Sequence, residues 1–224
     1  MKKENLYKAL FYFLGLAILS LGLILNSKSN LGVSPIVSVA YIFSIITGIT
    51  LSRATLYQYI IFIVVQMILH IIQKVENLKI KLIEDILQLV VSFIFTAFMS
   101  LYSNYIPLAT TTKNKILFLI FGVLFTGTGA AMSLVVRFIP NPGDGITQAI
   151  SDTIHKKLGT TKNIVDFVCV CLTVAISLIF KKEIIGIGLG TVVCVIMTGR
   201  VIALFNDLFK NKIEGLCGFK NQEG

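Results

Sequence analysis

Six long apolar runs constrain this chain more than any other feature. As helices, they are of the length needed to cross about 30 Å of hydrocarbon, which takes about 20 residues. They cover residues 10–25, 54–72, 83–102, 115–136, 161–180 and 184–205. A soluble core cannot hide this surface, because 55% of the 224 residues are hydrophobic and only 14% are charged. The sequence therefore predicts an all-α integral membrane protein with one membrane domain over residues 1–224.

Two shorter segments also have a helical pattern. They cover residues 35–47 and 143–157, about 13 and 15 residues, and are too short to span the hydrocarbon comfortably. Short segments of this kind suit half-crossing, re-entrant or interfacial helices. We therefore expect about six transmembrane helices plus two short ones.

The two halves of the chain resemble each other at an offset of 107 residues. Gly15 then falls on Gly122, Gly22 on Gly129 and Pro35 on Pro142. Weak internal symmetry of this kind is typical of transporters. The pattern predicts repeat halves at about 10–106 and 115–205, followed by a cytoplasmic tail at 206–224. With three spans in each half, the halves are expected to be inverted relative to each other.

Charge gives the expected orientation. The chain has 20 Lys and Arg against 11 Asp and Glu, a net charge of +9. If six spans cross and the N-terminus is inside, most of the basic residues fall on the cytoplasmic side, as the positive-inside rule requires. We therefore expect both termini to be cytoplasmic and membrane lipids to be partners. No basic cluster lies on a soluble module, so nucleic acid is not expected as a partner.

The stretch "FIPNPGDGITQAISDTIHKK", residues 138–157, interrupts the apolar pattern. Asn141 can cap a helix that Pro142 begins, and the neighbouring glycines allow backbone to approach a ligand. Asp144 and Gln148 start a polar stripe along this short helix. Two interpretations stay open: the stripe lines a binding site, or it faces the headgroups of an interfacial helix. We expect Asp144, Asn141 and Gln148 to bind substrate.

Asp166 is an ionisable residue a turn or so inside a predicted span. Such groups are expensive in a membrane and usually face a partner or a cavity, which makes Asp166 a second candidate for binding substrate. The alternative is an acid at interface level paired with Lys162 one turn earlier.

Other polar and aromatic residues in the spans add weaker candidates. Tyr41, with Tyr57 and Tyr59, could stack on a planar ligand, although tyrosine is also common at membrane interfaces. Gln58 could bind substrate, but for Gln58, Gln66 and His70 a hydrogen bond between helices is the favoured interpretation.

Catalytic and metal-binding patterns are absent from the sequence. No Walker lysine loop, HExxH or GxSxG motif appears, and the four cysteines suggest neither a zinc cage nor a disulfide framework. The sequence therefore predicts no enzyme, no catalytic residues, no metal site and no cofactor.

Several of these patterns together resemble a known family. The glycine pair of the first span, the "LGVSP" that follows it, "PGDGI" in the second half and the late "GIGLGTVVCVIMTGR" are similar to the YczE/YyaS/YitT-type bacterial membrane proteins. The resemblance covers about residues 14–205. It implies a multi-pass protein of the bacterial cytoplasmic membrane. Because some clostridial proteins of this kind have been proposed as S-components of energy-coupling-factor transporters, it also implies vitamin B6 compounds as ligands.

These observations combine into one expected function with two alternatives. We expect a membrane uptake protein that binds a small vitamin-like molecule, a B6 vitamer such as pyridoxamine, as an S-component that works with an energy-coupling ATPase module. A protonated amine suits a carboxylate and a planar ring suits an aromatic face. The alternatives are a regulatory or scaffold membrane protein and a self-contained secondary transporter.

Overall fold

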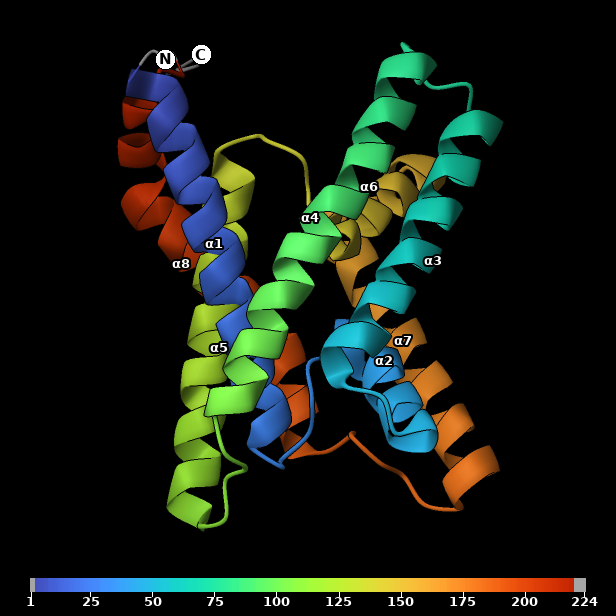
Figure 1. Cartoon of the computed structure of the whole chain (residues 1–224). Coiled ribbons are helices and arrows are strands. Elements are labelled where there is room, and N and C mark those ends of the chain that lie inside the picture. The colour runs from blue at the N-terminus through green and yellow to red at the C-terminus, as the bar shows by residue number, and fades with distance from the viewer. Residues whose placement is uncertain (1–2, 220–224) are drawn as a thin grey trace.

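The computed structural model describes residues 3–219, which fold into eight helices and no strand (Figure 1). The helices are α1 (Lys3–Lys28), α2 (Pro35–Thr47), α3 (Leu51–Ile72), α4 (Leu78–Tyr105), α5 (Thr112–Val135), α6 (Pro142–Ile154), α7 (Leu158–Lys181) and α8 (Leu189–Leu216). All except α2 and α6 are long and apolar enough to cross a membrane. The predicted all-α membrane fold is confirmed, with each predicted span and short helix represented by one helix.

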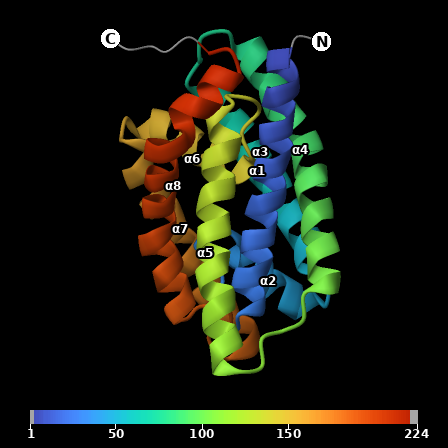
Figure 2. The same ribbon diagram turned by 90° about the vertical axis from the view of Figure 1, so that its left-hand side faces the viewer.

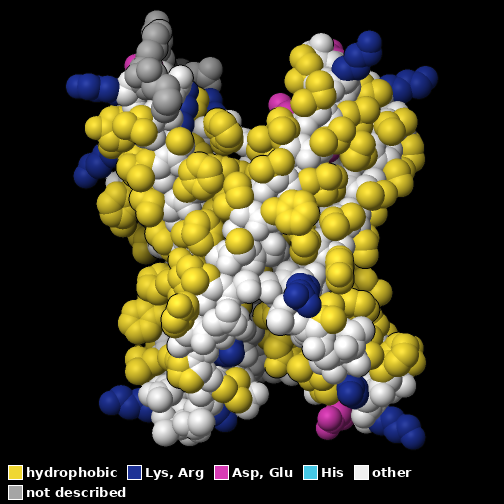
Figure 3. Space-filling view, viewed as in Figure 1, with side chains coloured by type: hydrophobic (Ala, Val, Ile, Leu, Met, Phe, Trp, Pro, Cys, Tyr) yellow, Lys and Arg dark blue, Asp and Glu magenta, His cyan; other side chains and the backbone are white. Residues whose placement is uncertain are grey.

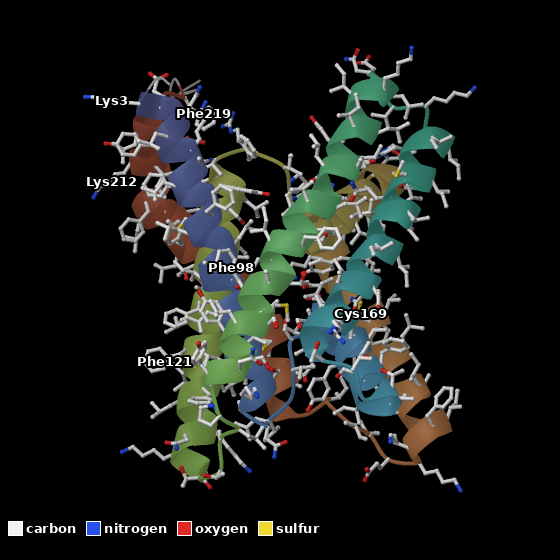
Figure 4. All side chains as sticks on the ribbon, viewed as in Figure 1. Lys3, Phe98, Phe121, Cys169, Lys212 and Phe219 are labelled. Carbon is white, nitrogen blue, oxygen red and sulfur yellow. The ribbon has the colours of Figure 1, made fainter. Side chains whose placement is uncertain are left out.

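The surface agrees with a membrane location. Hydrophobic side chains cover the middle of the molecule, and Lys and Arg gather toward its two ends (Figure 3). Phe121 projects outward from α5, whereas Lys3 and Lys212 project at the end where both termini lie (Figures 1 and 4). The protein is therefore a multi-pass membrane protein.

The last helix differs from the prediction at both ends. A span from residue 184 was expected, but α8 begins at Leu189 because the preceding segment is not helical. Gly186 has a φ of +80°, its carbonyl accepts a hydrogen bond of 2.9 Å from the amide of Val33, and the carbonyl of Leu31 accepts one of 2.8 Å from Gly190. At the other end α8 continues to Leu216, so much of the segment expected as a tail is helical.

Helix positions and contacts recur at an interval of 107 residues. α2 and α6 begin at Pro35 and Pro142, and α3 and α7 begin at Leu51 and Leu158. The packing recurs as well: α2 packs on α7 as α3 packs on α6, and α1 packs on α4 as α5 packs on α8. One pair breaks the rule, since α3 packs closely on α4 whereas α7 and α8 barely touch.

The centre of the molecule is the antiparallel crossing of α1 and α5, which lie side by side in both ribbon views (Figures 1 and 2). Gly15 and Gly22 of α1 face Gly129 and Gly122 of α5. A β-carbon at any of the four would lie within 3 Å of the facing helix, so only glycine permits this approach. Each glycine contacts the repeat counterpart of its partner, which is the contact pattern of a two-fold axis.

The two short helices meet near this axis. Each begins with proline after a polar cap residue, Ser34 before α2 and Asn141 before α6. A β-carbon at Gly143 would lie 3.3 Å from the side chain of Ile36, so the N-terminal ends of α2 and α6 are in contact. The structure therefore brings the two half-length helices together at the centre of the fold.

Candidate functional site

A cavity of about 360 Å³ lies beside the meeting point of α2 and α6. Side chains from α1, α3, α5, α6, α7 and α8 line it, and its apolar walls include Leu19 and Leu23. This volume lies within the range of small-molecule sites, and mainly apolar walls with a few polar groups are typical of them. The cavity is next to the gap where α8 stands away from α7.

Several lining residues come from matching positions of the two repeats. The pairs are Leu19 with Thr126, Leu23 with Ala130, Ser34 with Asn141, Ile36 with Gly143, and Tyr59 with Asp166. The cavity thus lies on the pseudo-two-fold axis. The chemistry of the pairs differs, because the second repeat contributes an acid where the first contributes a tyrosine.

Asp144 is the polar group nearest the helix junction. It lies in the first turn of α6, where the positive end of the helix dipole favours a carboxylate. The cap residue Asn141 holds this turn in place, since its side-chain oxygen accepts a 3.1 Å hydrogen bond from the amide of Gly143. Both Asn141 and Asp144 line the cavity. Among residues 3–219 the carboxylate of Asp144 forms no ion pair or hydrogen bond.

Asp166 also lines the cavity, but it has a partner. Lys162 Nζ lies 3.2 Å from Asp166 Oδ2, one turn away on α7. The ion pair predicted as the alternative for Asp166 is therefore present, although both of its members face the cavity. With Lys162 balancing one of the two carboxylates, the lining carries a net charge of −1 from Asp144.

Gln148 lies at the exposed rim of the cavity. Its side-chain amide donates a 2.8 Å hydrogen bond to Asp152, which is exposed. The polar stripe of α6 is thus divided, with Asp144 facing the cavity and Asp152 facing the surroundings.

Two predicted site residues lie elsewhere. Gln58 joins α3 to α2: its side-chain oxygen accepts a 2.8 Å bond from the amide of Ala40, and its nitrogen donates a 2.5 Å bond to the carbonyl of Ile36. Its amide is occupied by backbone, which is the interhelical role that was favoured for it. Tyr41 packs against Gly186, where the segment before α8 leaves no room for a side chain. Neither residue lines the cavity, and Tyr59, buried to 2% exposure, is the tyrosine that does.

Fold and cavity together define the class: a polytopic helical membrane protein with two inverted halves and a small-molecule cavity between them. The chain belongs to a family of unknown function, DUF6198, whose profile matches residues 6–207. It is also similar to the uncharacterized protein YyaS of Bacillus subtilis (strain 168), with 27% identity over 202 residues that cover 88% of this chain and 92% of that protein. No solved structure matches the chain.

Proposed function

We propose that this protein is a small-molecule carrier of the bacterial cytoplasmic membrane whose central cavity binds a molecule with a positive charge and a planar ring. The observation that carries the proposal is the unpaired carboxylate of Asp144 at the junction of two half-length helices. In inverted-repeat transporters, interrupted or short helices at corresponding positions of the halves line the substrate site. A cationic group would pair with Asp144, and the Tyr59 side chain offers an aromatic face.

Vitamin B6 compounds without a phosphate group are our first choice of ligand. Pyridoxamine combines a protonated amine, a planar ring and hydroxyl groups, and the lining offers an acid, an aromatic ring and the amides of Asn141 and Gln148. A phosphate ester would bring negative charge toward Asp144 and Asp166, with Lys162 as the one base in the lining. We therefore expect pyridoxamine to bind more tightly than its phosphate.

The arrangement of the halves favours a self-contained carrier over an S-component. Inverted repeats that meet at a central site suit alternating access by movement of one half against the other. The expected energy-coupling ATPase module is then not required. A scaffold protein, the other alternative, has no need for an unpaired acid facing a cavity.

A binding experiment tests the proposal. Pyridoxamine at about 100 times its dissociation constant should stabilise the detergent-solubilised protein by about 2.7 kcal/mol, which a thermal unfolding assay detects. Asp144→Asn keeps the shape but removes the charge, so affinity measured by calorimetry should fall about thirtyfold or more. The matched control is Asp152→Asn, which should change affinity by less than about twofold because that carboxylate is exposed and away from the cavity.

Two results would count against this site. If no B6 vitamer or other small cation changes the unfolding temperature, the scaffold interpretation replaces the carrier. If Asp144→Asn binds pyridoxamine normally while Asp166→Asn does not, the charge recognition lies on α7 instead of α6.

A further inference from the structure

A second ionisable cluster is buried outside the cavity, between α3, α4 and α6. His70 Nδ1 lies 2.8 Å from Asp85 Oδ2, and the other oxygen of Asp85 accepts a hydrogen bond from the side-chain amide of Gln66. Gln88 completes the cluster, and Gln66 and Gln88 lie against Gly145 of α6. Exposure is 3% for His70, 0% for Asp85, 2% for Gln66 and 1% for Gln88. None of the four lines the cavity.

The cluster has more acceptors than donors. Gln66 Oε1 and Gln88 Oε1 are buried and have no hydrogen-bond partner among the described residues. Buried polar groups are normally paired, so two orphaned oxygens beside a carboxylate require an explanation. What such a cluster can take up is a hydrogen-bond donor, and its one titratable donor is the imidazole of His70.

Few other charges face this pair. On α4, the neighbouring Glu84 pairs with Lys81 at 3.1 Å on the exposed side. On α6, which contributes Gly145 to the contact, Asp144 lines the cavity and Asp152 is exposed. On α3, Arg53 lies at the opposite end of the helix. The charge of the cluster therefore depends on His70 and Asp85 alone.

The corresponding interface of the other repeat has no ionisable group. Thr173 stands in place of Gln66, Ser177 in place of His70 and Ser38 in place of Gly145, each offset by 107 residues. The hydroxyl of Thr173 donates a 2.8 Å bond to that of Ser38. Hydroxyl contacts of this kind are sufficient to join a short helix to a long one, so packing alone does not explain a buried acid and histidine.

The cluster also bridges the one helix pair that distinguishes the halves. His70 is on α3 and Asp85 is on α4, and these helices pack closely while their counterparts α7 and α8 barely touch. Movement of one repeat against the other would exchange the two arrangements, closing α8 onto α7 and parting α4 from α3. Such a movement would separate His70 from Asp85 and admit water.

We propose that His70 and Asp85 form a proton-binding site that couples transport through the central cavity to a proton gradient, an inference that rests on the proposed carrier function. With a proton on each ring nitrogen of His70, the pair is imidazolium with carboxylate and has no net charge. Loss of that proton leaves a net charge of −1 in a sealed apolar environment, which is strongly unfavourable. The closed arrangement therefore retains the proton, and the opened, hydrated arrangement releases it to water.

Proteoliposomes test this coupling. The double variant His70→Gln with Asp85→Asn removes both ionisable groups and keeps amide hydrogen bonding, which avoids leaving a single buried charge. We expect wild-type protein to accumulate radiolabelled pyridoxamine under a proton gradient and also to exchange it without a gradient. The double variant should retain exchange within about twofold and lose gradient-driven accumulation, because exchange does not require net proton movement. Thr173→Val, the matched change in the other repeat, should retain both activities.

The outcomes separate the two proposals. Absence of pyridoxamine exchange in wild-type protein would remove the carrier function and the coupling with it. Normal exchange together with unchanged accumulation in the double variant would overturn only the proton site. Accumulation that follows a sodium gradient would also overturn it, because the orphaned oxygens would then be ligands of a metal cation.

An NMR experiment tests the site without any ligand. The chain has two histidines, so a protein labelled at the imidazole nitrogens gives two sets of signals, and His155→Gln assigns them. The signal of His70 should report a protonation change between about pH 5 and about pH 9, the range in which histidine titrates in proteins. Asp85→Asn should shift that change. A signal of His70 that stays constant over the whole range would overturn the proposal.

Discussion

The two halves of this protein place different chemistry at equivalent positions. In the first half α3 and α4 pack tightly over His70 and Asp85, which are sealed from solvent. In the second half α7 and α8 are apart, and the cavity with Asp166 and Lys162 lies next to the gap. One repeat unit thus has a closed form and an open form within a single chain. The difference indicates which helix pairs can move and which ion pair each arrangement controls.

The largest expected difference between the halves is in the stability contributed by the two ion pairs. Asp85→Ala would leave His70 and the Gln66 amide buried without a partner, which typically costs about 3 to 5 kcal/mol. Asp166→Ala would cost about 1 kcal/mol or less, because Lys162 is a third exposed and can reach water. Chemical denaturation of both variants in detergent measures this difference. Equal losses would mean that the two sides are equally sealed.

A smaller difference is expected where α6 and α2 pack on the long helices. Gly145→Ala would place a β-carbon 2.9 Å from Gln88 and closer still to Gln66, and overpacking of this kind costs about 1 to 3 kcal/mol. Its counterpart Ser38→Ala removes a hydroxyl bonded to Thr173 and should cost about 1 kcal/mol. Thermal unfolding of the two variants gives the comparison. A stabilising effect of Gly145→Ala would show that the glutamine cluster is loosely packed.

The smallest expected effect concerns chemical access to the open side. Cys194 lines the cavity, whereas Cys169 is buried where α7 packs on α2, near its label in Figure 4. In variants that keep one cysteine each, a cationic thiol reagent should modify Cys194 several-fold faster than an anionic one, since Asp144 attracts positive charge. Asp144→Asn should reduce this preference, and Cys169 should show none. Mass spectrometry over time measures the rates, and equal rates at Cys194 for both reagents would contradict a negatively charged cavity.

Much of the fold could be predicted from the sequence because the membrane imposes simple lengths. Apolar runs mark the spans, and α2 was predicted with its observed bounds because Pro35 begins it and Gly48 ends it in a left-handed conformation. The start of α8 was placed wrongly, because Ile184 and Ile187 continue the apolar pattern whereas the backbone at Gly186 leaves the helix.

The candidate site was harder to predict, because cavities depend on which helix faces meet. Asp144 and Asn141 could be identified from the local sequence, since a proline with glycines and an acid interrupts an apolar chain. The His70–Asp85 pair could not, because its members lie on different helices and each alone looks like an isolated polar residue near a span end. Tyr41 and Tyr59 are alike in sequence terms, and only packing shows that Tyr59 faces the cavity.

The glycine crossing of α1 and α5 has a consequence for biosynthesis. The helix that α1 packs on most closely is made about 107 residues later, which takes roughly 5 to 20 s at ordinary rates of translation. Until then α1 must remain in the membrane with its glycine face uncovered and with Asn26, which later donates a bond of 3.4 Å to Thr126, exposed to lipid or to an insertion factor. A ribosome stalled between α4 and α5 would therefore release a half-protein that is inserted but lacks its central contact, a natural substrate for membrane quality-control proteases.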